Sequence, residues 1–70
     1  MHTGEVWLGR TGTPYAGVSA TIDDVTTRNV VLSYDRVVDV NGVQTIGEVM
    51  TQKKFERMFE QIVYEQGELF

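Results

Sequence analysis

Few residues of this 70-residue chain could carry out catalysis, and their spacing forms no catalytic set. The chain has no cysteine and one histidine, His2. A serine nucleophile needs a base such as histidine beside it, and a cysteine nucleophile is absent. The carboxylates of Asp23 and Asp24 are adjacent, so on a strand they point to opposite faces and suit a turn better than an acid–base pair. We therefore expect a protein that is not an enzyme.

Metal ions and cofactors are not expected either. A cysteine-based zinc site is impossible without cysteine. The other carboxylates considered as ligands, Asp35, Asp39 and Glu48, are scattered and match no calcium-loop pattern. Exposed, solvated acids are the simpler interpretation, so the sequence predicts neither a metal site nor a bound cofactor.

The segment GRTGTPYAG, from Gly9 to Gly17, raises the question of phosphate binding. A P-loop needs the spacing G-x-x-x-x-G-K-[ST] between a strand and a helix, so that backbone amides converge on the phosphate. Here the glycines are spaced differently, no lysine follows, and the next residues have the pattern of a strand. We interpret the segment as a long loop whose glycines and Pro14 set its turn geometry.

Aromatic residues and an arginine near this loop are candidates for binding a protein partner. If Val6 and Leu8 face the core, Trp7 points outward beside the loop, as in the peptide grooves of SH3-like domains. Aromatic and arginine side chains also dominate the energetic centres of interfaces. In the alternative interpretation Trp7 belongs to the core and Val6 covers an edge. The predicted partner-binding residues are Trp7, Arg10, Tyr15 and Tyr34.

Basic residues gather at the start of the last predicted element and are alternative candidates for binding an anion: Lys53, Lys54 and Arg57. Bases at the start of a helix oppose its dipole, so this arrangement does not optimise the helix alone. A nucleic-acid-binding face would need Arg10 and Arg36 to converge with them. The simpler interpretation is that these charges are exposed and are neutralised by the nearby Glu48 and Glu56.

The elements that must position these residues change type once along the chain. Apolar residues alternate with period two up to Val49 and then recur with a period near 3.6. Asn41-Gly42, between β-branched residues, predicts a tight hairpin turn in which both residues have positive φ. Gly47 predicts a bulge or bend. The expected strands are residues 5–8, 16–23, 29–38 and 43–49.

Within these strands, one face of the second holds Val18, Ala20 and Ile22, and one face of the third holds Val30, Leu32 and Tyr34. After them a helix is expected over residues 52–66. Its N-cap is Thr51, and its stop is Gly67. Its apolar stripe is Phe55, Met58, Phe59, Ile62 and Val63.

A single α+β domain over residues 1–70 accounts for this pattern. About four strands form a small, strongly bent antiparallel sheet, and the C-terminal amphipathic helix covers one of its faces. An SH3-like, partly open barrel is the best fit, and an OB-like barrel, which usually needs five strands and a longer chain, is the alternative.

Three short motifs resemble those of small, uncharacterised SH3-like proteins encoded by phages and prophages. The matching residues are Gly4-Glu5-Val6-Trp7, Arg10-Thr11-Gly12, and the pair Phe55 and Phe59. The resemblance covers most of the chain and implies a small accessory protein, without assigning an activity.

Charge and composition disfavour several classes of partner and location. Ten acidic residues outnumber six basic ones, giving a net charge of −4, which disfavours a polyanionic partner. No apolar run could span a bilayer, and the first residues, MHTGEVW, lack the basic and apolar regions of a signal peptide. We therefore expect a cytoplasmic protein, acting in a host cell.

The first functional hypothesis is a phage-encoded interaction module that binds a host protein and modulates or inhibits it. The second is a nucleic-acid-associated regulator. The third is a structural subunit that self-associates through a sheet edge or the helix, as a homo-oligomer.

Overall fold

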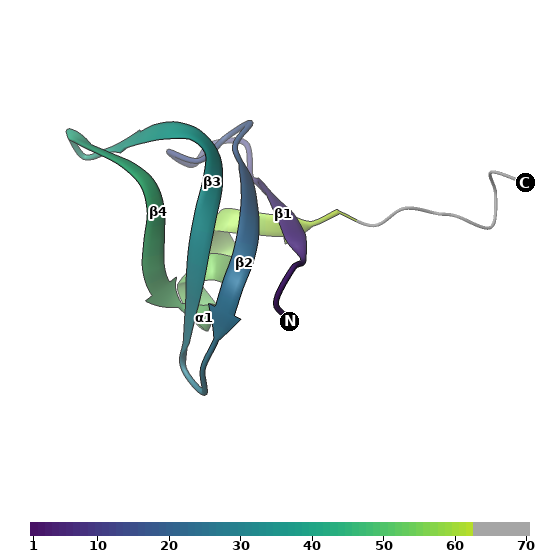
Figure 1. Cartoon of the computed structure of the whole chain (residues 1–70). Helices are drawn as coiled ribbons and strands as arrows, with labels where there is room; N and C mark the ends of the chain where they lie inside the picture. Colours follow the sequence, from purple (N-terminus) through teal and green to yellow (C-terminus); the bar gives the residue numbers. More distant parts are fainter. Residues whose placement is uncertain (63–70) are drawn as a thin grey trace, which may run out of the picture.

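The computed structural model describes residues 1–62, which form an antiparallel sheet and one short helix (Figure 1). The fold is an α+β mixture dominated by the sheet. It has five strands where about four were expected. The elements in chain order are β1 Val6–Gly9, β2 Ser19–Val25, β3 Asn29–Val40, β4 Val43–Thr51, α1 Gln52–Met58 and β5 Phe59–Gln61.

Every neighbouring pair of strands is antiparallel, and the strand order across the sheet is β4-β3-β2-β1-β5. The first four strands therefore follow one another as a meander. The predicted hairpin turn is confirmed, because Val40 pairs with Val43 and the two residues between them have φ of 54° at Asn41 and 84° at Gly42. These positive values are those of the primed turns that fit the twist of a hairpin.

β3 bends sharply where it passes β4 (Figure 1). Ser33 pairs with Gly47, and the next pair is Val38 with Thr45, so residues 34–37 of β3 lie opposite Ile46 alone. Extra residues on one strand of a pair force that strand to curve. A Cβ at Gly47 would lie 2.5 Å from the Leu32 carbonyl oxygen, so the bend expected at Gly47 depends on glycine there.

The helix is shorter than expected. Thr51 is its N-cap, as predicted, and its hydroxyl accepts a hydrogen bond from the Lys54 amide at 3.1 Å. The expectation of helix beyond residue 58 is wrong for the described part of the chain, because Phe59 is extended, with φ −130° and ψ 158°. The predicted helical residue Val63 and the predicted stop Gly67 lie outside the described residues.

The helix is short because the residues that follow it form a strand that pairs with β1, near the start of the chain. β5 pairs with the outer side of β1, where Gly9 lies opposite Phe59 and Trp7 opposite Gln61. The Arg10 amide also donates to the Met58 carbonyl at 2.8 Å, at the end of α1. Strand pairing with β1 therefore takes backbone groups that further helical turns would have used.

The core lies between one face of the sheet and α1. The buried faces expected for β2 and β3 are confirmed. Five aromatic rings fill the centre, with ring centroids 4.6 Å apart for Trp7 and Phe55 and 5.0 Å apart for Phe55 and Phe59. The buried apolar residues are Trp7, Tyr15, Val18, Ala20, Ile22, Val30, Leu32, Tyr34, Val38, Met50, Phe55 and Phe59.

Candidate functional site

The predicted exposed aromatic groove is wrong, because its three aromatic residues belong to the core. Trp7 is 9% exposed, Tyr15 1% and Tyr34 9%. On β1 it is Val6 that faces outward, at 41% exposed, so the alternative interpretation of Trp7 is the one that holds. Truncating Trp7 or Tyr15 would remove core packing, and neither side chain is placed to contact a partner in the folded chain.

Tyr15 instead ties the Gly9–Gly17 loop to β4. Its hydroxyl donates to the Glu48 carboxylate, at 3.0 Å from Oε1 and 3.2 Å from Oε2. Burial, together with the hydrogen bond and the charge of Glu48, raises the pKa of Tyr15 to about 12. The neighbouring Tyr34 hydroxyl is buried and has no hydrogen-bond partner among residues 1–62. Burial is also the main cause of the raised pKa of Tyr34.

Arg10 is the one predicted partner-binding residue that is exposed, and its side chain holds the loop in place. Its Nε and Nη2 donate to the Glu56 carbonyl at 3.3 and 3.2 Å. Its Nη1 lies 3.7 Å from the Glu60 carboxylate. The arginine thus links the loop to α1 and β5, a structural role that suffices to explain it.

The alternative anion-binding residues lie together on α1, and the fold adds a fourth base that sequence reasoning missed. The turn between β2 and β3 packs against the start of the helix, where the Gln52 amide donates to the Arg28 carbonyl at 2.8 Å and Gln52 Nε2 donates to the Thr26 carbonyl at 2.5 Å. These contacts place Arg28 near Lys53, and both residues line the same hollow. No sequence signal marks it, because the contact joins residues far apart in the chain. We call the residues Arg28, Lys53, Lys54 and Arg57 the basic surface.

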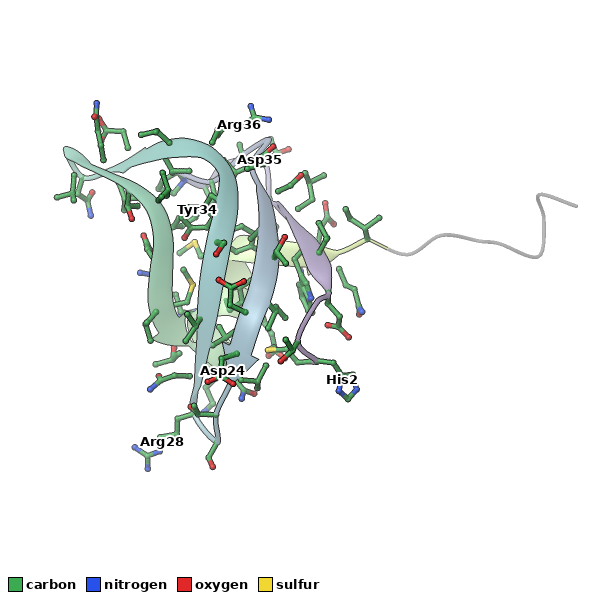
Figure 2. All side chains as sticks on the ribbon, in the orientation of Figure 1. His2, Asp24, Arg28, Tyr34, Asp35 and Arg36 are labelled. Carbon is green, nitrogen blue, oxygen red and sulfur yellow. The ribbon has the colours of Figure 1, made fainter. Side chains whose placement is uncertain are left out.

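The predicted convergence with the helix bases is wrong for Arg36, whereas Arg10 does lie against α1 through the Glu56 carbonyl. Arg36 pairs with Asp35, with Nη2 3.0 Å from Oδ2, at the opposite end of β3 from Arg28 (Figure 2). Arg10 pairs with Glu60. Among residues 1–62, none of the four bases of the basic surface forms an ion pair. The basic surface is therefore a local feature of an acidic chain.

Two shallow hollows adjoin the basic surface and share Lys53. One, of about 420 Å³, is lined by Thr27, Arg28, Thr51, Gln52 and Lys53. The other, of about 410 Å³, is lined by Lys53, Glu56 and Arg57. The first offers two cations, two hydroxyls and an amide, with no carboxylate in its lining. Such a set of groups suits an anion.

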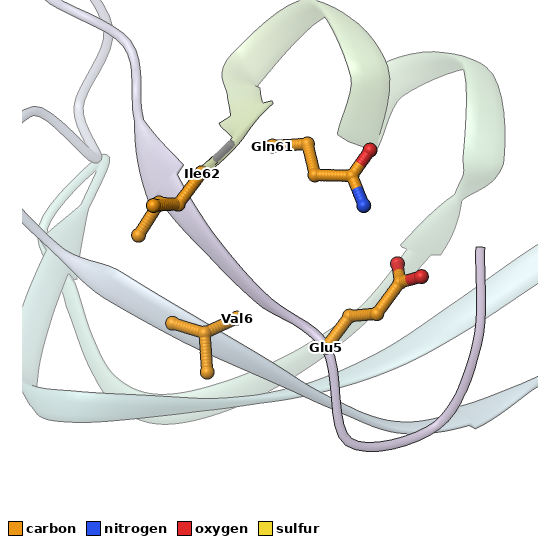
Figure 3. A pocket seen from close by; sticks show the side chains of 4 residues that line it. All are labelled: Glu5, Val6, Gln61 and Ile62. Atoms are coloured by element: carbon orange, nitrogen blue, oxygen red, sulfur yellow. The ribbon is translucent and has the colours of Figure 1, made fainter. Parts of the chain in front are cut away.

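A third pocket, of about 290 Å³, lies where β1 begins and β5 ends. Figure 3 shows the aliphatic side chains of Val6 and Ile62 on one side of it and the polar side chains of Glu5 and Gln61 on the other. The Glu5 carboxylate also accepts a hydrogen bond from Trp7 Nε1 at 3.1 Å, which lowers its pKa. The lining of this pocket holds no convergent set of hydrogen-bond donors, so we assign the pocket no ligand.

The most conspicuous apolar surface lies along β4, and it was not predicted from the sequence. β4 is an outer strand of the sheet, and within residues 1–62 nothing pairs with its free side. Val43 is 65% exposed, Ile46 67% and Val49 64%. A sequence signal existed, because residues 43–51 contain β-branched residues but no lysine, arginine or proline of the kind that protects an edge. We call this free side, with its three apolar residues, the β4 edge.

Within residues 1–62, no three histidine, cysteine, aspartate or glutamate side chains lie where they could share a metal ion. No helix in this part of the chain has the length and apolar character needed to cross a membrane.

Comparison of the chain with known protein families, with curated proteins and with solved structures finds no match. The surfaces of the chain itself therefore indicate its function.

Proposed function

We propose that this chain is a non-enzymatic interaction module that binds a protein partner by strand addition at the β4 edge. The observation that carries the proposal is an outer strand of nine residues, whose side away from β3 is unpaired within residues 1–62, with three β-branched apolar side chains about two-thirds exposed. An added strand would pair with the free backbone groups, while these side chains would supply apolar contact.

An SH3-like barrel is the architecture we propose for this module. The strand order β4-β3-β2-β1-β5, the strong bend of β3 and the short helix before β5 support it. The resemblance to phage-encoded proteins makes a host protein the expected partner, whose activity the module would modulate. Both the phage origin and the cytoplasmic location stay predictions.

Selection of binding peptides, followed by mapping, tests strand addition. Peptides selected from a random display library on the folded chain should be extended and apolar, and their largest effects on amide NMR shifts should fall along β4. Ile46→Lys should abolish their binding. Val6→Lys, also at an exposed valine but on β1 between two strands, should leave it intact. Shift changes confined to any other surface would contradict the proposal.

The basic surface supports a second candidate function, association with nucleic acid. Four bases without ion pairs in the described chain could contact successive phosphates, and such binding weakens steeply with salt. All tryptophan, tyrosine and phenylalanine residues within 1–62 are buried, so stacking on bases would not contribute. The overall charge of −4 opposes this function, and we place it second.

Fluorescence anisotropy of labelled DNA and RNA, measured across salt concentrations, tests the second candidate. Binding that is lost in Lys53→Ala with Arg57→Ala, and kept in Arg36→Ala, would support it, because Arg36 is paired with Asp35 away from the basic surface. Absence of binding at low salt would exclude it.

A further inference from the structure

The β4 edge is complementary to itself. Val43 and Val49 each stand three residues from Ile46, so the exposed apolar residues of the strand are symmetric about Ile46. In an antiparallel pair of two β4 strands centred on Ile46, Ile46 would face its own copy, and Val43 would face Val49 twice. Residues directly opposite in such a pair lie on the same face and touch.

We propose that a second copy of this chain occupies the β4 edge, forming a symmetric dimer with a continuous sheet across its two-fold axis. The inference rests on the proposed function, because it names the partner of the same strand. Two-fold contacts of this kind require a self-complementary surface, which the spacing of the three apolar residues supplies.

Polar residues of β4 select the same register. Centring on Ile46 places Gln44 opposite Glu48, so an amide can donate to a carboxylate. Centring on Glu48 would place two carboxylates face to face, and centring on Gly47 would place Ile46 against Glu48. Only the register centred on Ile46 matches the exposed apolar residues with one another and Gln44 with Glu48.

Single cysteines test the register, because the chain has no cysteine of its own. Directly opposite residues of an antiparallel pair have Cα atoms about 4.5–5.5 Å apart, within the range of a disulfide. Under mild oxidation Ile46→Cys should form a covalent dimer by itself. Val43→Cys and Val49→Cys should each form no covalent dimer alone and should cross-link when mixed. Val6→Cys, on β1, is the exposed control and should not cross-link.

Sedimentation of the unmodified chain supplies the second measurement. Its mass should be twice that of the monomer and should fall to that of the monomer in Ile46→Lys, with circular dichroism unchanged. A monomer at all concentrations, or cross-linking of Ile46→Cys no greater than that of Val6→Cys, would overturn the dimer. Peptide binding at β4 by such a monomer would still support the proposed function, so the two proposals fail separately.

Discussion

Tyr15 and Glu48, 33 positions apart in the sequence, are joined by a hydrogen bond from the phenol to the carboxylate at 3.0 Å. The bond closes the loop after β1 onto β4. It lies beside the Tyr34 hydroxyl, which is buried without a partner in the described chain. The two tyrosine hydroxyls should therefore contribute differently to the free energy of unfolding.

Removing the two hydroxyls should have unequal effects on stability. Tyr15→Phe breaks a hydrogen bond to a charged group and should lower the free energy of unfolding by about 1.5–3 kcal/mol. Tyr34→Phe removes a buried hydroxyl that has no hydrogen-bond partner within residues 1–62, so it should change stability by less than about 0.5 kcal/mol or raise it. Urea unfolding of the two variants measures both changes. A larger loss in Tyr34→Phe would show that its hydroxyl has a partner.

Alkaline pH should destabilise the fold through Tyr15. The folded pKa of about 12 lies above the ordinary value of 10, so the unfolded chain loses this proton first as pH rises. Stability from this group is complete below pH 10 and falls by about 1.4 kcal/mol per pH unit between pH 10 and 12. Unfolding measured across that range should have a shallower pH slope in Tyr15→Phe. Equal slopes would argue against the raised pKa.

Phe59 should be essential to the fold. Its side chain is fully buried against Tyr15 and Phe55, with ring centroids 4.9 and 5.0 Å away. Truncating a buried phenylalanine costs about 3–5 kcal/mol, which is comparable with the whole stability of a small domain. Phe59→Ala should therefore lose the cooperative thermal transition, while the surface variant Val6→Ala keeps it. A transition within a few degrees of the parent would contradict the packing described.

The hairpin turn should depend on Gly42. Its φ of 84° is in the left-handed region, which costs other residues about 1–2 kcal/mol and β-branched residues more. Gly42→Val should destabilise the fold by at least that amount in urea unfolding. No side chain would be blocked there, because nothing lies within 4 Å of an added Cβ, so the loss would report backbone conformation alone. Asn41→Gly, which keeps positive φ accessible, is the matched control.

The sequence alone was sufficient for features decided by neighbouring residues. Asn41-Gly42 has the chemistry of a primed turn whatever surrounds it, and Thr51 caps a helix through an amide three residues on. The alternation of Val30, Leu32 and Tyr34 likewise defines a face of β3. Each of these depends on local backbone geometry, which side-chain type biases directly.

Tertiary structure decided the features in which distant segments compete. Val6, Trp7 and Leu8 are all apolar, so alternation could not tell which face was inward, and packing of Trp7 on Phe55 settled it. In the sequence, Phe59 continues the apolar stripe of the helix. In the structure it lies in a strand, because it pairs with β1, some fifty residues earlier in the chain. Contacts between distant segments decide three features: Trp7 is buried, β5 pairs with β1, and the β4 edge is exposed. The free energy of these contacts exceeds the weak local preferences for helix or strand.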